Sequence, residues 1–236
     1  MYSDQVVPES ENVWQARAAF YALFANILSV PCSETWGDKV FALPMAEMLQ
    51  DIACDLGITD MWQTILNEAG SSGSVQRQMY YDHLEECFQR NFLVPLKGEM
   101  IPLGASAYLR NDQMHESRMT FFEGLYLQFS FDWRNVFAGT EGVWPNEPEH
   151  AVLILTMLAI ISQQIATATE DSESGARLPR YLQLLREIFG MAHPWLAQCF
   201  ARVASEASGE FYRFFGTFMA EFLSMDQELW DLAMSA

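Results

Sequence analysis

The sequence predicts an all-α fold, because its apolar residues recur at helical spacing near both ends of the chain. The stripe near the N-terminus consists of Trp14, Ala18, Tyr21, Ala25 and Leu28. The stripe near the C-terminus consists of Phe211, Phe215, Phe218, Phe222, Met225 and Leu229. No segment alternates apolar and polar residues for long enough to require a β-sheet. We therefore expect helices that each bury one face.

The individual helices follow from this periodicity and from the residues that interrupt it. The first helix carries the N-terminal stripe and ends at Pro31. Before the C-terminal helix, others are predicted over residues 38–56, 59–69, 75–93, 115–131, 148–168, 179–189 and 194–206. Gly190 and Pro194 separate the last two, since glycine favours the position after a helix and proline favours its first turn.

Four stretches break the helical pattern. GSSGS at 70–74 and EDSESG at 170–175 have the composition of turns and solvated loops. Residues 94–113 form a predicted loop of about twenty residues, a length that is uncommon inside a domain unless the loop has a function. The break over 139–146 suggests a boundary. We predict an N-terminal helical subdomain over 1–145, including the 94–113 loop, and a C-terminal helical subdomain over 146–236.

Charge and cysteine content narrow the functional classes. A formal net charge of -18 repels nucleic acid and anionic lipid surfaces, and it attracts a cationic partner. The four cysteines include no Cys-x-x-Cys pair, which argues against a zinc or redox motif and is typical of a reducing compartment. The chain shows no secretory signal, and its longest apolar run, Ala151 to Ile161, is about half a membrane span. We expect a cytoplasmic protein that binds no nucleic acid and does not insert into a membrane.

The run Asn146-Glu147-Pro148-Glu149-His150 directly precedes the most apolar predicted helix. Asn146 is a favoured N-cap, Glu149 stands at the capping-box position, and Pro148 is tolerated in a first helical turn. These roles leave His150 unexplained. A titratable group that both donates and accepts hydrogen bonds, placed at the mouth of an apolar helix, makes the run a candidate functional site.

Two other functional classes remain open at this point. Glu147 with His150, and Asp112 with His115, have the Glu-x-x-His type of spacing found in helical-bundle metalloenzymes, but both pairs lie at helix starts or in a loop rather than mid-helix. We therefore expect no metal ligands here. An acidic helical scaffold that binds folded partners is the other alternative. No nucleophile elbow, P-loop or dinucleotide fingerprint is present, so no catalytic residue is predicted.

Several motifs resemble the TorD/DmsD/NarJ family of molybdoenzyme maturation chaperones. Residues 146–150 are similar to the family's Glu-Pro-Asp-His hinge motif, with Glu149 in place of the aspartate. The other similar segments are PLGASAY at 102–108, RMTFFEGL at 118–125, HPWLAQCFARV at 193–203 and GEFYRFFGTFMAEFL at 209–223. The likeness runs in matching order over residues 17–223. It is weakest at 103–105, where the family's tyrosine-glutamate pair is missing.

The resemblance implies an all-α, TorD-like fold whose two subdomains are joined by a hinge. Its implied function is non-enzymatic: a chaperone binds the twin-arginine signal peptide and apo form of a molybdopterin-dependent oxidoreductase subunit, assists cofactor insertion and delays export. The residues implied for peptide binding are Glu147, Glu149 and His150, with Tyr126, Trp133 and Trp144 as apolar walls. Asn146 and Pro148 would form the hinge.

The resemblance also shapes what we expect to be bound. No cofactor is expected in stoichiometric amount, whereas the client enzyme should carry molybdopterin. The sequence leaves three questions open: which client enzyme is served, whether a nucleotide binds, and whether the protein is a monomer or a domain-swapped dimer.

Overall fold

The computed structural model describes residues 11–93, 100–109, 115–135, 147–170 and 174–235. Within these residues the chain forms nine α-helices and no strand, so the predicted all-α fold is confirmed. The helices are α1 (Glu11–Ser29), α2 (Glu34–Phe41), α3 (Met45–Asp55), α4 (Thr59–Ala69), α5 (Val75–Phe88), α6 (His115–Gln128), α7 (Ala151–Glu170), α8 (Leu178–Glu206) and α9 (Glu210–Ser235). A π-helical turn at Gln89–Leu93 and 3-10 turns at Ala105–Ala107 and Ser174–Arg177 complete the described elements.

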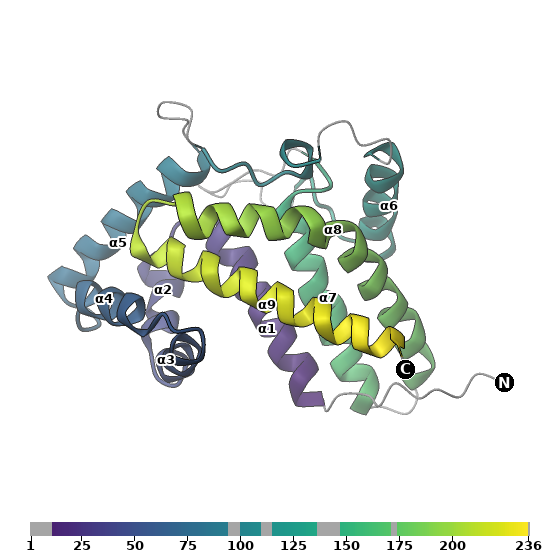
Figure 1. Cartoon of the computed structure of the whole chain (residues 1–236), viewed down its shortest axis with the longest axis horizontal. Coiled ribbons are helices and arrows are strands. Elements are labelled where there is room, and N and C mark those ends of the chain that lie inside the picture. Colours follow the sequence, from purple (N-terminus) through teal and green to yellow (C-terminus); the bar gives the residue numbers. More distant parts are fainter. Residues whose placement is uncertain (1–10, 94–99, 110–114, 136–146, 171–173, 236) are drawn as a thin grey trace.

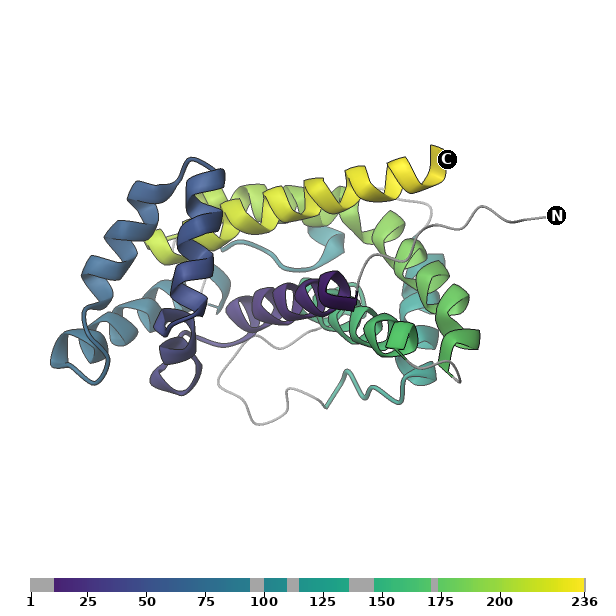
Figure 2. The same cartoon turned by 90° about the horizontal axis from the view of Figure 1, so that it is seen from below.

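The helices are arranged around two packed pairs. α7 lies along α1, and α8 and α9 form a neighbouring antiparallel pair (Figures 1 and 2). The connection between α8 and α9 is short, which favours antiparallel neighbours. Gly209 in that connection has φ 84°, a conformation that favours glycine. Helices α2 to α5 gather at one end of the molecule and α6 lies at the other (Figure 1).

The predicted apolar stripes form much of the core. All five residues of the N-terminal stripe are buried, and of the C-terminal stripe Phe211, Phe215 and Phe218 are buried. α1 meets α9 through edge-on aromatic contacts, such as Phe24 with Phe218 at 5.1 Å between ring centroids. Met225 departs from the prediction, because it is 60% exposed. Leu229 lies in a part of α9 whose side chains are not described.

α7 is the most buried helix of the described structure. Of its first eight residues, Ala151 to Leu158, all except the half-buried Thr156 are inaccessible to solvent. By length and composition alone, Ala151–Thr169 is apolar enough to cross a membrane, but 67% of that window is buried inside the protein, against neighbours that include α1 and α8. Its apolar character is thus accounted for by helix packing.

The helix boundaries differ from the prediction where packing overrides local signals. Residues 38–56 do not form one helix, because the chain turns at 42–44 between α2 and α3. Residues 179–206 are one helix with Pro194 inside it, so the predicted stop at Gly190 is wrong. Proline cannot donate to the carbonyl four residues earlier, which bends a helix, and α8 changes direction along its length (Figure 1). Burial of residues such as Ile188 and Leu196 on both sides keeps the helix continuous.

The predicted subdomain boundary at 145/146 is crossed by one continuous hydrophobic core. The buried cluster includes Leu28 and Phe88 from before the boundary and Leu155 and Phe215 from after it. The boundary itself and the hinge residue Asn146 lie outside the described residues. The two-subdomain division stays a prediction.

Candidate functional site

Residues 147–150 pair with an earlier loop through main-chain hydrogen bonds. The N–H of Ala105 donates to the carbonyl of Glu149 at 3.2 Å, and the N–H of Ala151 donates to the carbonyl of Leu103 at 2.7 Å. Together they form an isolated antiparallel bridge. The bridge ties the start of α7 to a segment that is distant in sequence.

This bridge determines where α7 begins. The sequence predicted a helix from residue 148 with Glu149 in its capping box. α7 instead begins at Ala151, because the main chain just before it is used by the bridge. The capping-box role of Glu149 is therefore wrong, and Asn146, the predicted cap, lies outside the described residues.

His150 takes the capping role. Its carbonyl accepts from the N–H of Ile154 at 3.1 Å, and its Nδ1 accepts from the N–H of Val152 at 3.3 Å. Because Nδ1 accepts, the proton of the neutral ring sits on Nε2. The side chain is buried, and burial lowers the pKa of the imidazole to about 3.

The replacement His150→Asn should make the free energy of unfolding depend less on pH below about pH 6.5. Asparagine supplies a capping oxygen but does not titrate. Between the ordinary pKa of 6.5 and the folded value of about 3, the unfolded chain binds a proton that the folded chain excludes. The parent therefore loses up to about 1.4 kcal/mol per pH unit as pH falls through this window. Urea unfolding at pH 7.5, 6 and 5 measures the difference between parent and variant. His83→Asn, at an exposed histidine, is the control, and equal slopes for parent and His150→Asn would contradict the assignment.

Glu149, which the family resemblance implies for peptide binding, is fully buried and so is not exposed to a peptide. Its Oε1 is 2.5 Å from Nε of Arg118, which is itself buried on α6. A carboxylate withdrawn from water is costly unless a buried cation compensates it. In this conformation Glu149 therefore fixes α6 against residues 147–150 rather than meeting a ligand.

Tyr126 makes a second connection from α6 to the same run. Its hydroxyl donates to the carbonyl of Pro148 at 2.6 Å, and its ring is almost completely buried. Pro148 is also buried. Two side chains of one helix, Tyr126 and Arg118, thus position consecutive residues of the candidate site.

Glu147 is the acidic residue of the run that reaches a partly exposed position. Its Oε1 accepts from the hydroxyl of Ser106 at 3.2 Å and lies 3.5 Å from the N–H of the same residue. A Cβ at Gly104 would lie 1.8 Å from that oxygen. Gly104, where the family resemblance is weakest, thus leaves the space that the Glu147 carboxylate fills.

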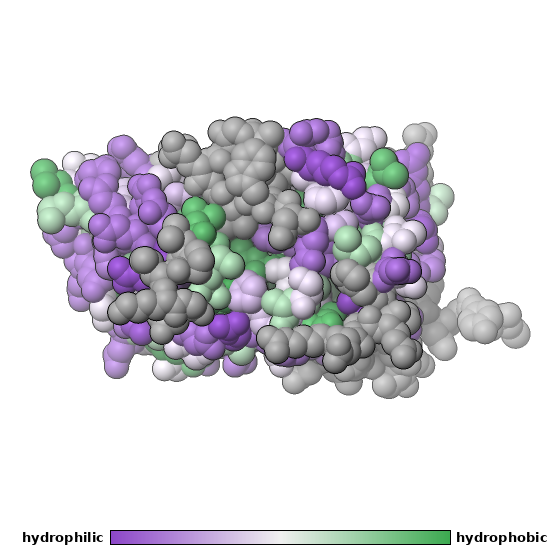
Figure 3. Space-filling view, turned by 90° about the horizontal axis from the view of Figure 1, so that it is seen from above, coloured by the Kyte–Doolittle hydropathy of each residue, from purple (hydrophilic) through white to green (hydrophobic). Residues whose placement is uncertain are grey.

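A pocket of about 220 Å³ lies beside these groups, and we call it the motif pocket. Its polar lining comes from Glu147, His150 and Ser106, and its apolar lining includes Phe92 and Ile101. The face that carries residues 100–109 has apolar residues near its centre, between hydrophilic borders (Figure 3). The pocket thus combines a carboxylate with an apolar wall.

A second pocket, of about 370 Å³, lies at the end of α6, and we call it the turn pocket. It is lined by Glu123, Tyr126, Leu127, Ser130, Phe131, Asp132, Trp133 and Arg134. The local sequence builds it through a Schellman turn: the N–H of Phe131 donates to the carbonyl of Tyr126 at 2.8 Å, and that of Ser130 to Leu127 at 3.1 Å. The turn folds Phe131 onto Tyr126, with ring centroids 5.5 Å apart.

Ser130 occupies the left-handed position of this turn, with φ 53°. A side chain there costs about 1–2 kcal/mol, whereas glycine adopts the conformation freely but loses more chain entropy on folding. Ser130→Gly should therefore stabilise the protein by about 0.5–1 kcal/mol, which corresponds to a rise in Tm of about 2–3 °C for a chain of this size. Thermal unfolding measures it, and an unchanged or lower Tm would contradict the turn assignment.

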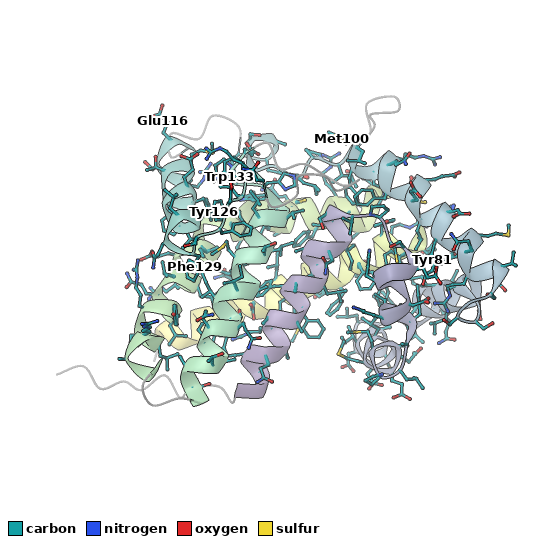
Figure 4. The ribbon with its side chains drawn as sticks, turned by 180° about the vertical axis from the view of Figure 1, so that it is seen from behind. Tyr81, Met100, Glu116, Tyr126, Phe129 and Trp133 are labelled. Atoms are coloured by element: carbon teal, nitrogen blue, oxygen red, sulfur yellow. The ribbon has the colours of Figure 1, made fainter. Side chains whose placement is uncertain are left out.

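The structure divides the predicted peptide-binding residues between these places. Glu147 and His150 line the motif pocket, Tyr126 and Trp133 line the turn pocket, and Glu149 lines neither. Figure 4 shows Tyr126 and Trp133 close together, with Met100 of the motif pocket well apart from them. Trp144 lies outside the described residues.

Sequence reasoning assigned no role to Arg118, Gly104 or Ser106. Arg118 is the first residue of the RMTFFEGL segment, which carries part of the family resemblance. The sequence therefore drew attention to Arg118, but it did not indicate that Arg118 would pair with Glu149. Gly104 and Ser106 lie in the long predicted loop and in its PLGASAY segment, so the length of the loop and the resemblance of that segment were the signals available for them.

Among the residues that the structure describes, no group of three or more His, Cys, Asp and Glu side chains could hold a metal ion. Asp112 of the second acid–histidine pair lies outside this part of the chain.

No family model matches the chain, and neither a curated protein nor a solved structure matches it. The membership suggested by the sequence motifs stays a prediction. The function is therefore argued from the residues and their geometry.

Proposed function

We propose that the protein is a cytoplasmic, non-enzymatic chaperone that binds the twin-arginine signal peptide and apo form of a molybdopterin-dependent oxidoreductase subunit. In this role it assists cofactor insertion and delays export. The observation that carries the proposal is that the partly exposed Glu147 carboxylate and an apolar wall line the same pocket, the motif pocket. A twin-arginine leader presents the complementary groups, namely cationic side chains followed by an apolar stretch.

The positioning of Glu147 supports a binding role rather than a purely structural one. The neighbouring acidic residue, Glu149, is withdrawn into an ion pair with Arg118, and Tyr126 holds the intervening Pro148. These buried contacts fix the main chain on which Glu147 stands. A preorganised charge loses less freedom on binding than a mobile one.

The motif pocket also offers a neutral donor. The Nδ1 atom of His150 is engaged by the helix, so its Nε2–H is the ring group left to meet a ligand carbonyl. Because burial keeps the pKa of His150 near 3, the ring stays uncharged at neutral pH and does not repel a cationic peptide. A neutral donor beside an acid suits an extended peptide that carries positive charge.

The net charge of -18 supports the same partner at longer range. An acidic surface attracts a cationic peptide and speeds its encounter, and the apolar wall then retains the peptide once it has docked. The sequence resemblance to molybdoenzyme maturation chaperones supplies the identity of the client class. No bond is made or broken in this function.

The replacement Glu147→Gln should weaken leader binding with little effect on folding. Glutamine keeps the size and the acceptor oxygen but removes the charge, so the affinity should fall about fivefold to tenfold, corresponding to about 1–1.4 kcal/mol. The probe is a synthetic peptide with two consecutive arginines followed by about twelve apolar residues, the length of an ordinary signal-peptide core. Isothermal titration calorimetry measures the dissociation constant.

Glu116→Gln is the matched control, because it removes an exposed charge from α6 at a residue that lines neither pocket. It should change the affinity less than twofold, through screened long-range attraction alone. Equal effects of the two replacements would remove the Glu147 contact from the mechanism and leave only the general acidity of the surface.

A further inference from the structure

The turn pocket already holds a guanidinium group, supplied by the chain itself. Nη2 of Arg134 lies 2.6 Å from Oε1 of Glu123, and its Cζ lies 4.4 Å from the centroid of the Trp133 ring. The pocket is also lined by the carboxylate-bearing Asp132 and the ring of Tyr126. A carboxylate beside an aromatic face is the pair of contacts by which proteins recognise arginine.

The contacts of Arg134 can be exchanged at small energetic cost. The side chains of Arg134 and Glu123 are 64% and 43% exposed, so their ion pair is screened by water and salt and adds little to stability. Arg134 is also exposed, so its side chain is not held in place by burial. A second guanidinium arriving from outside would find equivalent contacts once Arg134 swings away.

The walls of the pocket are held far more firmly than its occupant. Tyr126 is buried, and its hydroxyl is hydrogen-bonded to the carbonyl of Pro148. The Schellman turn places Phe131 against the ring of Tyr126. The Trp133 ring lies 6.4 Å from that of Tyr126 between centroids, and Figure 4 shows the two side by side. A rigid aromatic wall with a loosely held internal cation is the arrangement expected of a site whose cation is replaced during function.

We propose that the turn pocket binds an arginine side chain of the signal peptide in the place that Arg134 occupies in the free protein. The inference rests on the proposed function, since the occupant is the same leader peptide. It adds a second point of contact, separate from the motif pocket, and it gives Arg134 the role of an internal competitor. The charge of the pocket selects a cation, and its stacking face selects arginine over lysine.

The preference for arginine over lysine provides the test. Guanidinium stacks on the indole and reaches the carboxylate with two donors, whereas an ammonium is a compact hydrated charge. We expect the parent to bind a twin-arginine leader about tenfold more tightly than the same peptide with two lysines. Trp133→Leu should reduce this ratio to about twofold or less while leaving the affinity for the twin-lysine peptide within about twofold of the parent. The unchanged twin-lysine affinity shows that the variant is folded.

Arg134→Gln tests the competitor role in the opposite direction. Removing the internal guanidinium should tighten binding of the twin-arginine leader about threefold, because the leader no longer displaces an occupant. Arg213→Gln is the matched control: Arg213 forms an equivalent short-range pair with Glu210 at the start of α9, at the opposite end of the molecule from α6 (Figure 1). Both variants make the net charge one unit more negative, so a gain confined to Arg134→Gln isolates displacement from general electrostatics.

The outcomes separate this inference from the proposed function. A parent protein that binds neither peptide overturns both. A parent that binds the leader while Trp133→Leu keeps the full arginine preference, or while Arg134→Gln and Arg213→Gln behave alike, overturns the turn-pocket assignment and leaves leader binding at the motif pocket intact. The assignment is supported if Trp133→Leu loses the preference for arginine over lysine and if Arg134→Gln, but not Arg213→Gln, binds the twin-arginine leader more tightly.

Discussion

The replacement Arg118→Met should lower the free energy of unfolding by about 3–5 kcal/mol, because it leaves the fully buried Glu149 carboxylate without its arginine. Methionine fills comparable apolar space, so packing loss is a minor part of the effect. The variant should unfold at clearly lower urea concentration with a similar dependence on denaturant. Equilibrium urea unfolding followed by circular dichroism measures this.

A double variant distinguishes the ion pair from simple packing. When Glu149→Leu accompanies Arg118→Met, neither charge of this buried pair remains, and replacing both members of a buried pair by apolar residues is often close to neutral. We expect the double variant to recover most of the lost stability. If the two single losses simply added, the two side chains would be acting independently and the pair would not be what holds α6 against the start of α7.

Gly216→Ala should destabilise the protein by about 2 kcal/mol, although alanine is the better helix former. A Cβ at Gly216 on α9 would lie 2.4 Å from the main-chain nitrogen of Ala204 on α8, and no side-chain rotation relieves contact with a main chain. Overpacking of this kind costs up to about 3 kcal/mol, which outweighs the gain of about 1 kcal/mol in helix propensity.

Gly124→Ala is the matched control for this close approach. Gly124 lies within α6, is exposed, and has no atom within 4 Å of an added Cβ. Its replacement should raise stability by about 0.5–1 kcal/mol through propensity alone. Opposite signs for the two glycines are expected in thermal unfolding, and a stabilising Gly216→Ala would mean that α8 and α9 are not closely packed at this point.

The sequence predicted those parts of the fold that depend on local periodicity. The stripe from Trp14 to Leu28 is buried throughout, and the helix predicted over 59–69 has the same limits in the structure. The prediction failed where local and tertiary forces compete. Gly190 and Pro194 are helix-ending residues in isolation, but the burial of their neighbours keeps α8 continuous and the proline bends it instead.

The sequence predicted where the candidate site lies, but it predicted the roles of the individual residues only in part. The unusual run at 146–150 was found from its composition, and Glu147 and His150 do meet at a pocket. The burial of Glu149 was not predictable, because its partner Arg118 lies on α6, a separate part of the chain, and their meeting depends on how α6 packs. The contact between Gly104 and Glu147 likewise joins two loops whose pairing no local pattern encodes.

The most direct test of leader binding is a calorimetric titration of the unmodified protein with the synthetic twin-arginine peptide at 0.1 M and 1 M salt. Exposed charges are screened beyond about 10 Å at the lower concentration and beyond about 3 Å at the higher one, whereas apolar contacts persist. We predict saturable one-to-one binding that weakens at 1 M salt without being abolished. Absence of saturable binding at 0.1 M salt would contradict the proposed function, and an affinity indifferent to salt would contradict the part assigned to Glu147 and the acidic surface.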